Sequence, residues 1–300
     1  MIKLIFIFFT CWIPIHSLSA AFITESAIDG CFNKITISGI INSEDSLIFQ
    51  KKYEKLKLDF ENSKCKKVLK DINFSIGIDL NSRGGNLNES MKIGSFIRAK
   101  ELNTSVAHDK ECLSSCVFIL AAGVTRVTWG KIGIHRPYFE HLKSGTTISE
   151  IKQIREENTK VIKEYFNKMD ISELIVDEML SIEPDKIKVL NENELIRFRL
   201  SLMDSDYEER STAEGAKDYN ITSALYRERL SLQEKRCGFY GKAIDNKRES
   251  EFFKCQNMVM LNISESEFLN REAKAKSTCF KMEQGPNRGR CLFDVRILGK

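Results

Sequence analysis

The chain has 300 residues, and its 46 Lys and Arg side chains nearly balance 42 Asp and Glu, for a net charge of +4 at pH 7. Charges of both signs are mixed along the whole chain, and no basic stripe with interleaved aromatic residues occurs. This pattern argues against a nucleic-acid-binding surface and predicts no nucleic-acid partner. The length is sufficient for two domains.

The first 21 residues have the pattern of an export signal. Lys3 gives a positive start, residues 4–15 are nearly all apolar, and small residues before Ala21 suit cleavage after it. The apolar run is too short for a comfortable membrane span, so membrane attachment is expected only if this segment stays uncleaved. Residues 1–21 are therefore interpreted as a signal peptide.

Cysteine number agrees with export. The chain has nine cysteines, and cleavage would remove Cys11 and leave an even number. An even number is expected of a disulfide-bonded protein in an oxidising compartment, so we expect a periplasmic or secreted protein. The alternative is a cytosolic protein with buried thiols. The absence of a CxxC pair and the scattered histidines predict no metal site.

Apolar spacing predicts an α/β protein. Apolar residues that alternate with polar ones predict strands at 33–41, 72–80 and 104–107. Between these strands, apolar residues at helical spacing predict helices at 43–60 and 87–99. This βαβαβ order is typical of a largely parallel sheet with helices on its faces.

Further along the chain, Thr147 and Glu150 form a capping-box pattern that begins a long helix. A second helix is expected at 172–180 and a short strand at 186–190. From residue 206 the sequence becomes charged and mostly helical, with four cysteines. We therefore predict one domain at 28–205 and a small, disulfide-bonded helical domain at 206–300.

Three segments carry candidate chemistry. Gly84 and Gly85 follow a strand and could aim backbone amides into a crevice, although a plain turn would also use two glycines. Ser114 precedes an apolar helix, where both it and Ser115 could equally be N-caps. His135 ends a strand-like run, a place where a lone histidine is commonly structural. The ordered set of glycine turn, serine turn and histidine favours a serine acyl hydrolase.

These motifs resemble those of the Clp-type serine peptidases of the Clp/crotonase superfamily, in particular exported relatives with a CxSxC serine motif. Residues 81–85 (NSRGG) resemble the family's N-S-P-G-G turn, residues 114–123 its serine helix, and residues 134–137 (IHRP) its I-H-Q-P. The likeness extends over residues 35–200. It implies a Clp/crotonase-like fold, catalysis without a cofactor, and a peptide or protein substrate.

The resemblance also implies roles for individual residues. Counting back from Gly123 places the nucleophile at Ser114 and not at Ser115, with His135 as general base. Oxyanion donors are expected from the Gly84–Gly85 turn and the Ser115 amide. A helix from about Ser149 resembles the family's ring-to-ring handle and implies a homo-oligomer, although its charged face suits a monomer equally well.

Two positions depart from the family pattern. Arg83 replaces the proline of the turn and brings a cation to the crevice mouth. Ile187 occupies the position of the catalytic acid, and Asp185 is the nearest carboxylate. An offset of two residues along a strand would keep Asp185 on the same face, so it is the candidate acid. Alternatively, Asp185 is a surface charge and the site is a Ser-His dyad.

Cys112 and Cys116 flank Ser114 and are candidates for a disulfide that holds the serine turn, or else for packing as small apolar groups.

Together these features predict an exported serine hydrolase, most simply a peptidase. The alternative is a catalytically silent Clp-like protein that binds peptides or partners. An acyl-CoA enzyme of crotonase type is disfavoured, because an exported protein would not meet coenzyme A.

Overall fold

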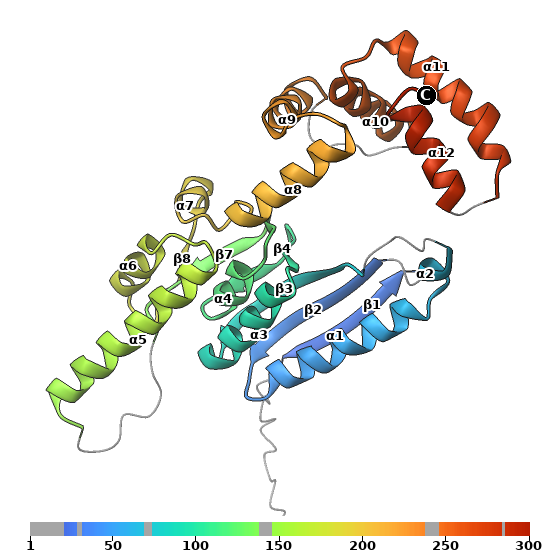
Figure 1. The fold of residues 1–300 in the computed structure, drawn as a ribbon. Helices are drawn as coiled ribbons and strands as arrows, with labels where there is room; N and C mark the ends of the chain where they lie inside the picture. The colour runs from blue at the N-terminus through green and yellow to red at the C-terminus, as the bar shows by residue number, and fades with distance from the viewer. Residues whose placement is uncertain (1–20, 29–31, 69–73, 138–145, 238–245, 284–285) are drawn as a thin grey trace, which may run out of the picture.

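The computed structural model describes residues 21–28, 32–68, 74–137, 146–237, 246–283 and 286–300 (Figure 1). The predicted export signal therefore lies outside the described residues except for Ala21. The described chain is an α/β structure with one mixed sheet of mostly parallel strands and flanking helices, as the sequence predicts. No helix within these ranges combines the length and apolar character that a membrane span requires.

The sheet of the described residues has eight strands, in the order β1-β2-β3-β5-β7-β8, with β4 beside β3 and β6 beside β4. The outer pairs β1–β2 and β7–β8 are antiparallel, and the pairs between them are parallel. The strands are β1 Phe22–Ile28, β2 Phe32–Ile41, β3 Ile76–Gly85, β4 Asn103–Val106, β5 Glu111–Leu113, β6 Arg126–Thr128, β7 Lys131–Ile134 and β8 Lys188–Val189.

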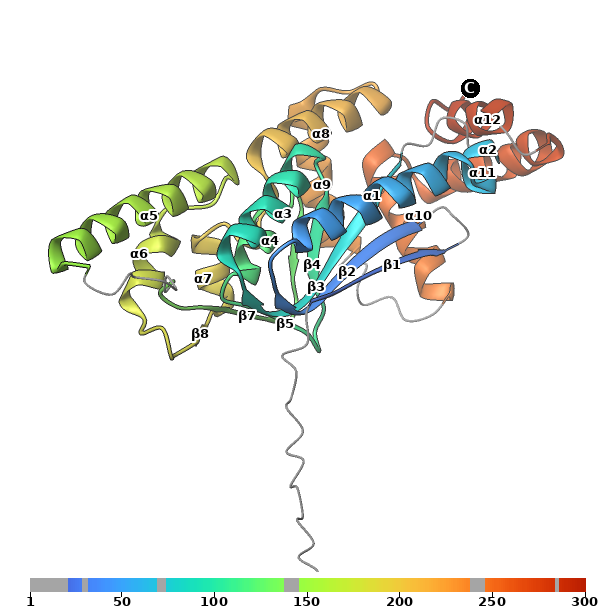
Figure 2. The same ribbon diagram turned by 90° about the horizontal axis from the view of Figure 1, so that it is seen from below.

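The helices of the α/β unit are α1 Asp45–Glu61, α2 Lys64–Val68, α3 Leu87–Ala99, α4 Cys116–Ala121, α5 Ile148–Lys168, α6 Leu174–Ser181 and α7 Glu192–Arg197. Helices α1, α3 and α4 lie against the same face of the sheet (Figure 2). Alternate residues of β3, such as Ile78 and Leu80, are buried, whereas Asp79 between them is partly exposed and forms an ion pair with Lys34. This alternation is the physical origin of the period-two pattern in the sequence.

Several predicted elements are confirmed nearly to the residue. The predicted helix 87–99 is α3, and the predicted strand 33–41 is β2 with one additional residue. Thr147 caps α5, and Glu150 completes the capping box. By contrast, only two residues of the predicted strand 186–190 are extended in β8, because the preceding chain turns, with Lys186 N–H donating to the Glu183 carbonyl at 3.0 Å.

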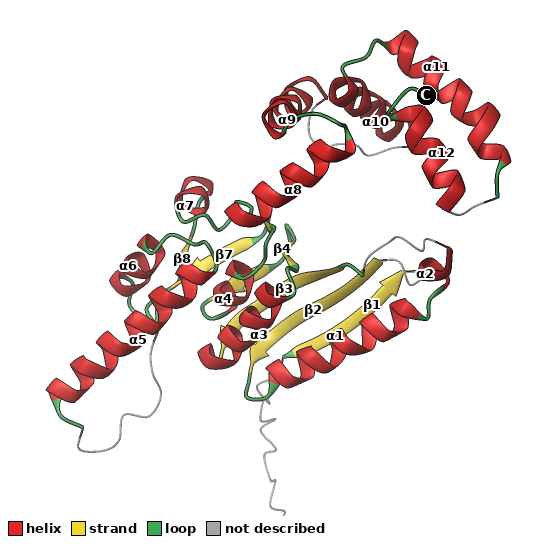
Figure 3. Cartoon of the chain, viewed as in Figure 1, coloured by secondary structure: helices red, strands yellow, loops and turns green. Residues whose placement is uncertain are grey.

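From residue 205 the described chain consists of helices, red in Figure 3, and the loops that connect them. The elements of this region are α8 Ser205–Asp218, α9 Ser223–Cys237, α10 Asn246–Leu261, α11 Glu265–Thr278, the 3-10 turn η2 Cys279–Lys281 and α12 Pro286–Arg296. Helix α8 leads away from the sheet to the other helices (Figure 1). Disulfides join Cys237 to Cys255 and Cys279 to Cys291. Together with the bond between Cys112 and Cys116, they are consistent with an oxidising, exported location.

Candidate active site

The carboxyl ends of the neighbouring strands β3, β5 and β7 meet at one edge of the sheet (Figure 2). Gly85 ends β3, Ser114 follows β5, and His135 follows β7. Because these strands are parallel, their last residues converge although the sequence separates them by 20 residues or more. This edge is the usual place for a ligand crevice in an α/β sheet.

Ser114 occupies a sharp turn between β5 and α4. Its φ of 56° lies in the left-handed region, which is uncommon for a residue with a side chain and is frequent at functional sites. The Ser114 N–H donates to the Gly133 carbonyl of β7 at 2.9 Å, which anchors the turn to the neighbouring strand. Ser114 is partly exposed, whereas the residues on both sides of it are buried.

The side chains of Ser114 and His135 are hydrogen-bonded. Ser114 Oγ lies 2.7 Å from His135 Nε2, and His135 Nδ1 lies 2.9 Å from the carbonyl oxygen of Arg136. A carbonyl only accepts hydrogen bonds, so Nδ1 must carry the proton in this arrangement. The neutral imidazole then presents a lone pair at Nε2 to the serine hydroxyl, as a general base requires.

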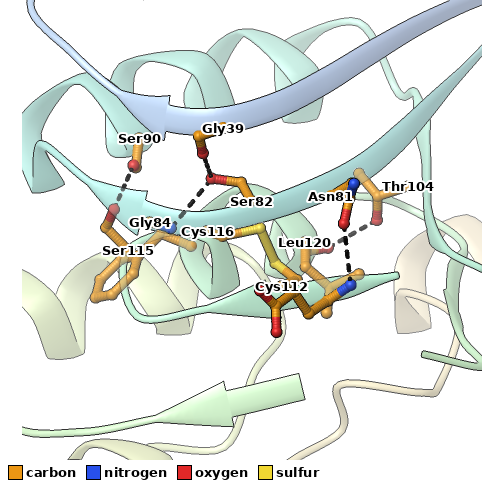
Figure 4. The surroundings of a disulfide bond; sticks show 12 residues. Gly39, Asn81, Ser82, Gly84, Ser90, Thr104, Cys112, Ser115, Cys116 and Leu120 are labelled. Atoms are coloured by element: carbon orange, nitrogen blue, oxygen red, sulfur yellow. Dashed lines mark hydrogen bonds between the residues drawn. A yellow bond between two sulfur atoms is a disulfide. The ribbon is translucent and has the colours of Figure 1, made fainter. Parts of the chain in front are cut away.

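The glycine turn is built around the hydroxyl of Ser82. That hydroxyl donates to the Gly39 carbonyl at 2.6 Å and accepts from the Gly84 N–H at 3.1 Å (Figure 4). It thereby bridges the register shift between β2 and β3. The Gly84 N–H is therefore already hydrogen-bonded and is not a free donor. The role of Gly84 is to let the glycine turn pack closely against the serine turn.

Gly84 touches the serine turn directly. A Cβ added to Gly84 would lie 2.8 Å from the Ser115 backbone nitrogen and 2.7 Å from the Leu113 carbonyl oxygen, closer than real contacts allow, and its φ is +90°. Only glycine therefore lets the β3 turn and the Ser114 turn approach each other this closely. The Ser115 amide lies at this junction.

Gly85 is the second candidate oxyanion donor. The amides on either side of it point toward β2, since Asn86 N–H donates to the Ile41 carbonyl at 2.8 Å and Gly84 N–H to the Ser82 bridge. Gly84 and Gly85 have positive φ values of 90° and 144°, so the backbone leaves the regular strand geometry at this turn. The Gly84 N–H is already bonded to Ser82, which leaves Gly85 and Ser115 as the candidate oxyanion donors.

The side chain of Ser115 has a different environment from that of Ser114. It is buried, and its hydroxyl shares a hydrogen bond of 3.0 Å with the hydroxyl of Ser90 in α3 (Figure 4). Ser90 is fully buried and also donates to the Asn86 carbonyl. The Ser115 hydroxyl therefore joins two helices, and only Ser114 faces the imidazole.

A disulfide encloses the nucleophile turn. Cys112 and Cys116 are bonded to each other, with their Cα atoms 5.2 Å apart, and both are fully buried (Figure 4). The bond connects the middle residue of β5 to the first residue of α4. It therefore restrains the backbone on both sides of Ser114.

The structure does not bring Asp185 to the imidazole. Within the described chain no hydrogen bond connects Asp185 to His135, and Asp185 is exposed in the turn that precedes β8. The pairing of Gly133 with Val189 and of Ile134 with Lys188, extended by one residue, places Ile187 opposite His135. The alternation that would have kept Asp185 on this face fails because residues 183–186 form a turn and not a strand.

The side chain of Arg83 is 75% exposed, and its Nε is 3.5 Å from a carboxylate oxygen of Glu111 in β5. An exposed pair of this kind contributes little to stability.

Among the described residues, no group of three or more His, Cys, Asp and Glu side chains is arranged to hold a metal ion.

Two contributors to this site were not found by sequence reasoning. The Arg136 carbonyl orients the imidazole, but a backbone carbonyl has no side-chain signature. Ser90 supports Ser115 from a helix 25 residues earlier, and only the packing of α3 on α4 reveals the contact. The motif order indicated the three principal segments, and tertiary structure added the groups that hold them.

The sequence matches no protein-family model, and no curated protein matches it either.

Proposed function

We propose that this protein is an exported serine hydrolase that cleaves peptide bonds with Ser114 and His135. The single observation that carries the proposal is the hydrogen bond of 2.7 Å between Ser114 Oγ and His135 Nε2. It occurs at a serine whose backbone has positive φ, beside a glycine turn that packs closely against the serine turn. Nucleophile, base and oxyanion donors within hydrogen-bond reach are the parts of an acyl-transfer site.

The chemistry proceeds in two halves. In the first, Ser114 Oγ attacks the substrate carbonyl carbon while His135 Nε2 takes the hydroxyl proton, and the amides of Gly85 and Ser115 stabilise the resulting oxyanion. The imidazolium then gives its proton to the leaving amine as the C–N bond breaks, which leaves an acyl-Ser114 ester. In the second half, water attacks this ester with His135 again as base and releases the acid.

A Clp/crotonase-like fold for residues 28–205 belongs to the same proposal. The parallel βαβ order, the glycine turn after β3, the serine turn after β5 and the histidine after β7 support it. The four helices α9 to α12, with two disulfides, support a separate disulfide-bonded unit after residue 205. A peptide substrate follows from the resemblance to Clp-type peptidases, since a fold alone does not define a substrate.

The position of Asp185 favours a second candidate, a catalytically silent peptide-binding protein. Without the carboxylate that the family places beside its histidine, the site would have the geometry of a hydrolase but little turnover. The two candidates differ in one property, the reactivity of the Ser114 hydroxyl.

The deciding experiment is labelling of the purified mature protein with a fluorophosphonate probe, which reacts covalently with activated serines. We expect labelling of the wild-type protein and of Ser115→Ala, and no labelling of Ser114→Ala or His135→Ala. Labelling lost in Ser115→Ala and retained in Ser114→Ala would reverse the assignment. No labelling of the folded wild-type protein would support the silent peptide-binding alternative.

A further inference from the structure

An apolar groove of about 190 Å³ lies beside the candidate active site, between α5 and α6. Its walls come from the facing sides of the two helices, at the helical spacings of i, i+3 and i+4. These wall residues are Ile151, Ile154, Ile162, Val176, Met179 and Leu180. The groove continues to Arg136 and Pro137, directly after His135 in the chain.

The size of the groove indicates what it can hold. Sites for drug-sized ligands have about 300–1,000 Å³, so the groove suits one apolar side chain better than a whole small molecule. Its floor is buried at Ile162, Val176 and Met179, whereas Ile151 and Ile154 at the rim are partly exposed. An apolar side chain entering from the rim would be stabilised by leaving water.

One end of the groove carries an unpaired positive charge. Arg136 has a buried Nε with no hydrogen-bond acceptor, and it forms no ion pair within the described ranges. A buried donor without an acceptor is costly, and a carboxylate is the acceptor that fits a guanidinium best. Arg136 also stands where the resembled family has glutamine, so it adds a charge to the IHRP segment.

The neighbouring carboxylates are already engaged by lysines. Asp177 pairs with Lys163, Glu178 with Lys188, and Glu183 with Lys186. The groove therefore combines an apolar wall with a cation whose counter-charge is not supplied by these side chains. A ligand with complementary charge would bring its own carboxylate.

The groove ends at the residue that follows the candidate base. Arg136 immediately follows His135, and consecutive Cα atoms are about 3.8 Å apart. Its backbone is anchored on the α6 side, where the Arg136 N–H donates to the Ile182 carbonyl at 3.2 Å. A peptide bound at Ser114 that extends past His135 would meet Arg136 at this end of the groove.

We propose that the groove selects peptides in which an apolar side chain is followed by an acidic one. The apolar side chain enters between α5 and α6, and Arg136 binds the adjoining carboxylate. The inference rests on the proposed function, because it names the substrate class of the same site. Arg136 is accordingly a specificity-determining residue and takes no part in bond cleavage.

The test uses the Ser114→Ala variant, which binds peptides without cleaving them, and fluorescence anisotropy with three labelled hexapeptides. The peptides differ only at the two central residues, which are Leu-Glu, Leu-Gln and Ala-Glu. We expect the Leu-Glu peptide to bind about tenfold more tightly than Leu-Gln, since a hydrogen-bonded charge pair of about 1.4 kcal/mol corresponds to that ratio. Ala-Glu should also bind several-fold more weakly than Leu-Glu.

The matched control separates a local contact from the general effect of charge. Arg136→Gln and Arg155→Gln remove the same charge, but Arg155 lies on the exposed rim in α5. Arg136→Gln should abolish the preference for Leu-Glu over Leu-Gln, and Arg155→Gln should retain most of it. Equal binding of all three peptides, binding of none, or equal effects of the two arginine variants would overturn the inference.

The binding experiment and the probe experiment can each reject one proposal without rejecting the other. A fluorophosphonate-reactive protein whose Ser114→Ala variant shows no preference for Leu-Glu would retain the hydrolase proposal and reject the groove assignment. A protein that binds Leu-Glu selectively without probe labelling would retain the ligand of the groove and reject hydrolysis.

Discussion

The hydroxyl of Ser115 shares a hydrogen bond with that of Ser90, 3.0 Å away, whereas the hydroxyl of Ser114 faces His135. The two adjacent serines, of which the family resemblance selects Ser114, thus have different surroundings. One connects α3 to the start of α4, and the other is available to a base at the crevice. The difference leads to separable effects of substitution at the two positions.

Ser115→Ala should lower stability without abolishing probe labelling. Loss of the Ser115 hydroxyl leaves the buried Ser90 hydroxyl with one hydrogen-bond partner fewer, which costs about 1 kcal/mol of stability. The Ser115 backbone amide remains in place. Chemical denaturation would measure the stability, and fluorophosphonate labelling the site. A Ser115→Ala protein of unchanged stability that no longer labels would contradict the role given to this hydroxyl.

Gly84→Ala should disrupt the site far more than Gly77→Ala in the same strand. A methyl group at Gly84 would overlap the backbone of the serine turn, whereas nothing lies within 4 Å of a Cβ at Gly77. We expect a destabilisation of about 1–3 kcal/mol and loss of labelling for Gly84→Ala, with neither effect for Gly77→Ala. Equal behaviour of the two variants would mean that the close approach of the turns is unimportant.

Asp185→Asn should change the rate of labelling or hydrolysis less than about threefold, because Asp185 is exposed and does not contact the imidazole. His135→Ala, measured alongside it, should reduce the rate by orders of magnitude. In the best-studied triad the corresponding Asp-to-Asn change costs about ten-thousand-fold. A loss approaching that size at Asp185 would show that it does orient His135 in the working enzyme.

Removal of the Cys112–Cys116 disulfide should affect the site more than the stability of the domain. The bonded cysteines are four residues apart, and so short a loop contributes little chain entropy. Replacing both by alanine frees the backbone around Ser114, so probe labelling should slow several-fold while the Tm changes little. Both sulfurs are buried, and reduction in the native state should therefore be slow. Unchanged labelling would assign the pair to packing alone.

Asp170 should contribute to stability in a pH-dependent way. Partial burial raises its pKa, but hydrogen bonds from Arg199 and Ser205 outweigh this effect and hold the pKa below its ordinary value. A carboxyl with a lowered pKa stabilises the fold above the unfolded pKa of about 3.9, and this contribution disappears as the pH falls through the folded pKa.

The Asp170→Asn variant tests this expectation. It should be less stable than the wild type by about 1–3 kcal/mol at pH 7, and the two proteins should approach equal stability near pH 2. Denaturation curves across this pH range give the comparison. A stability difference that does not depend on pH would show that Asp170 acts through neutral hydrogen bonds.

Elements with a strong period were predictable because their pattern records burial on one face. Helix α3 coincides with the predicted range 87–99, and β2 differs from its predicted range by one residue. The predicted strand 186–190 is longer than β8, which contains only Lys188 and Val189. A run of three or four alternating residues is too short to separate a strand from a neighbouring turn.

The sequence by itself determined the α/β order, the glycine turn, the serine turn and the histidine, because each is a local pattern of residue types. Only the tertiary structure showed that the Ser114 hydroxyl contacts His135 while that of Ser115 contacts Ser90, that Gly84 fits against the serine turn, and that Asp185 lies apart from His135. Those relations depend on the pairing of parallel strands far apart in the chain. A register displaced by one residue would turn each of these side chains to the opposite face, and spacing along a single strand does not specify that register.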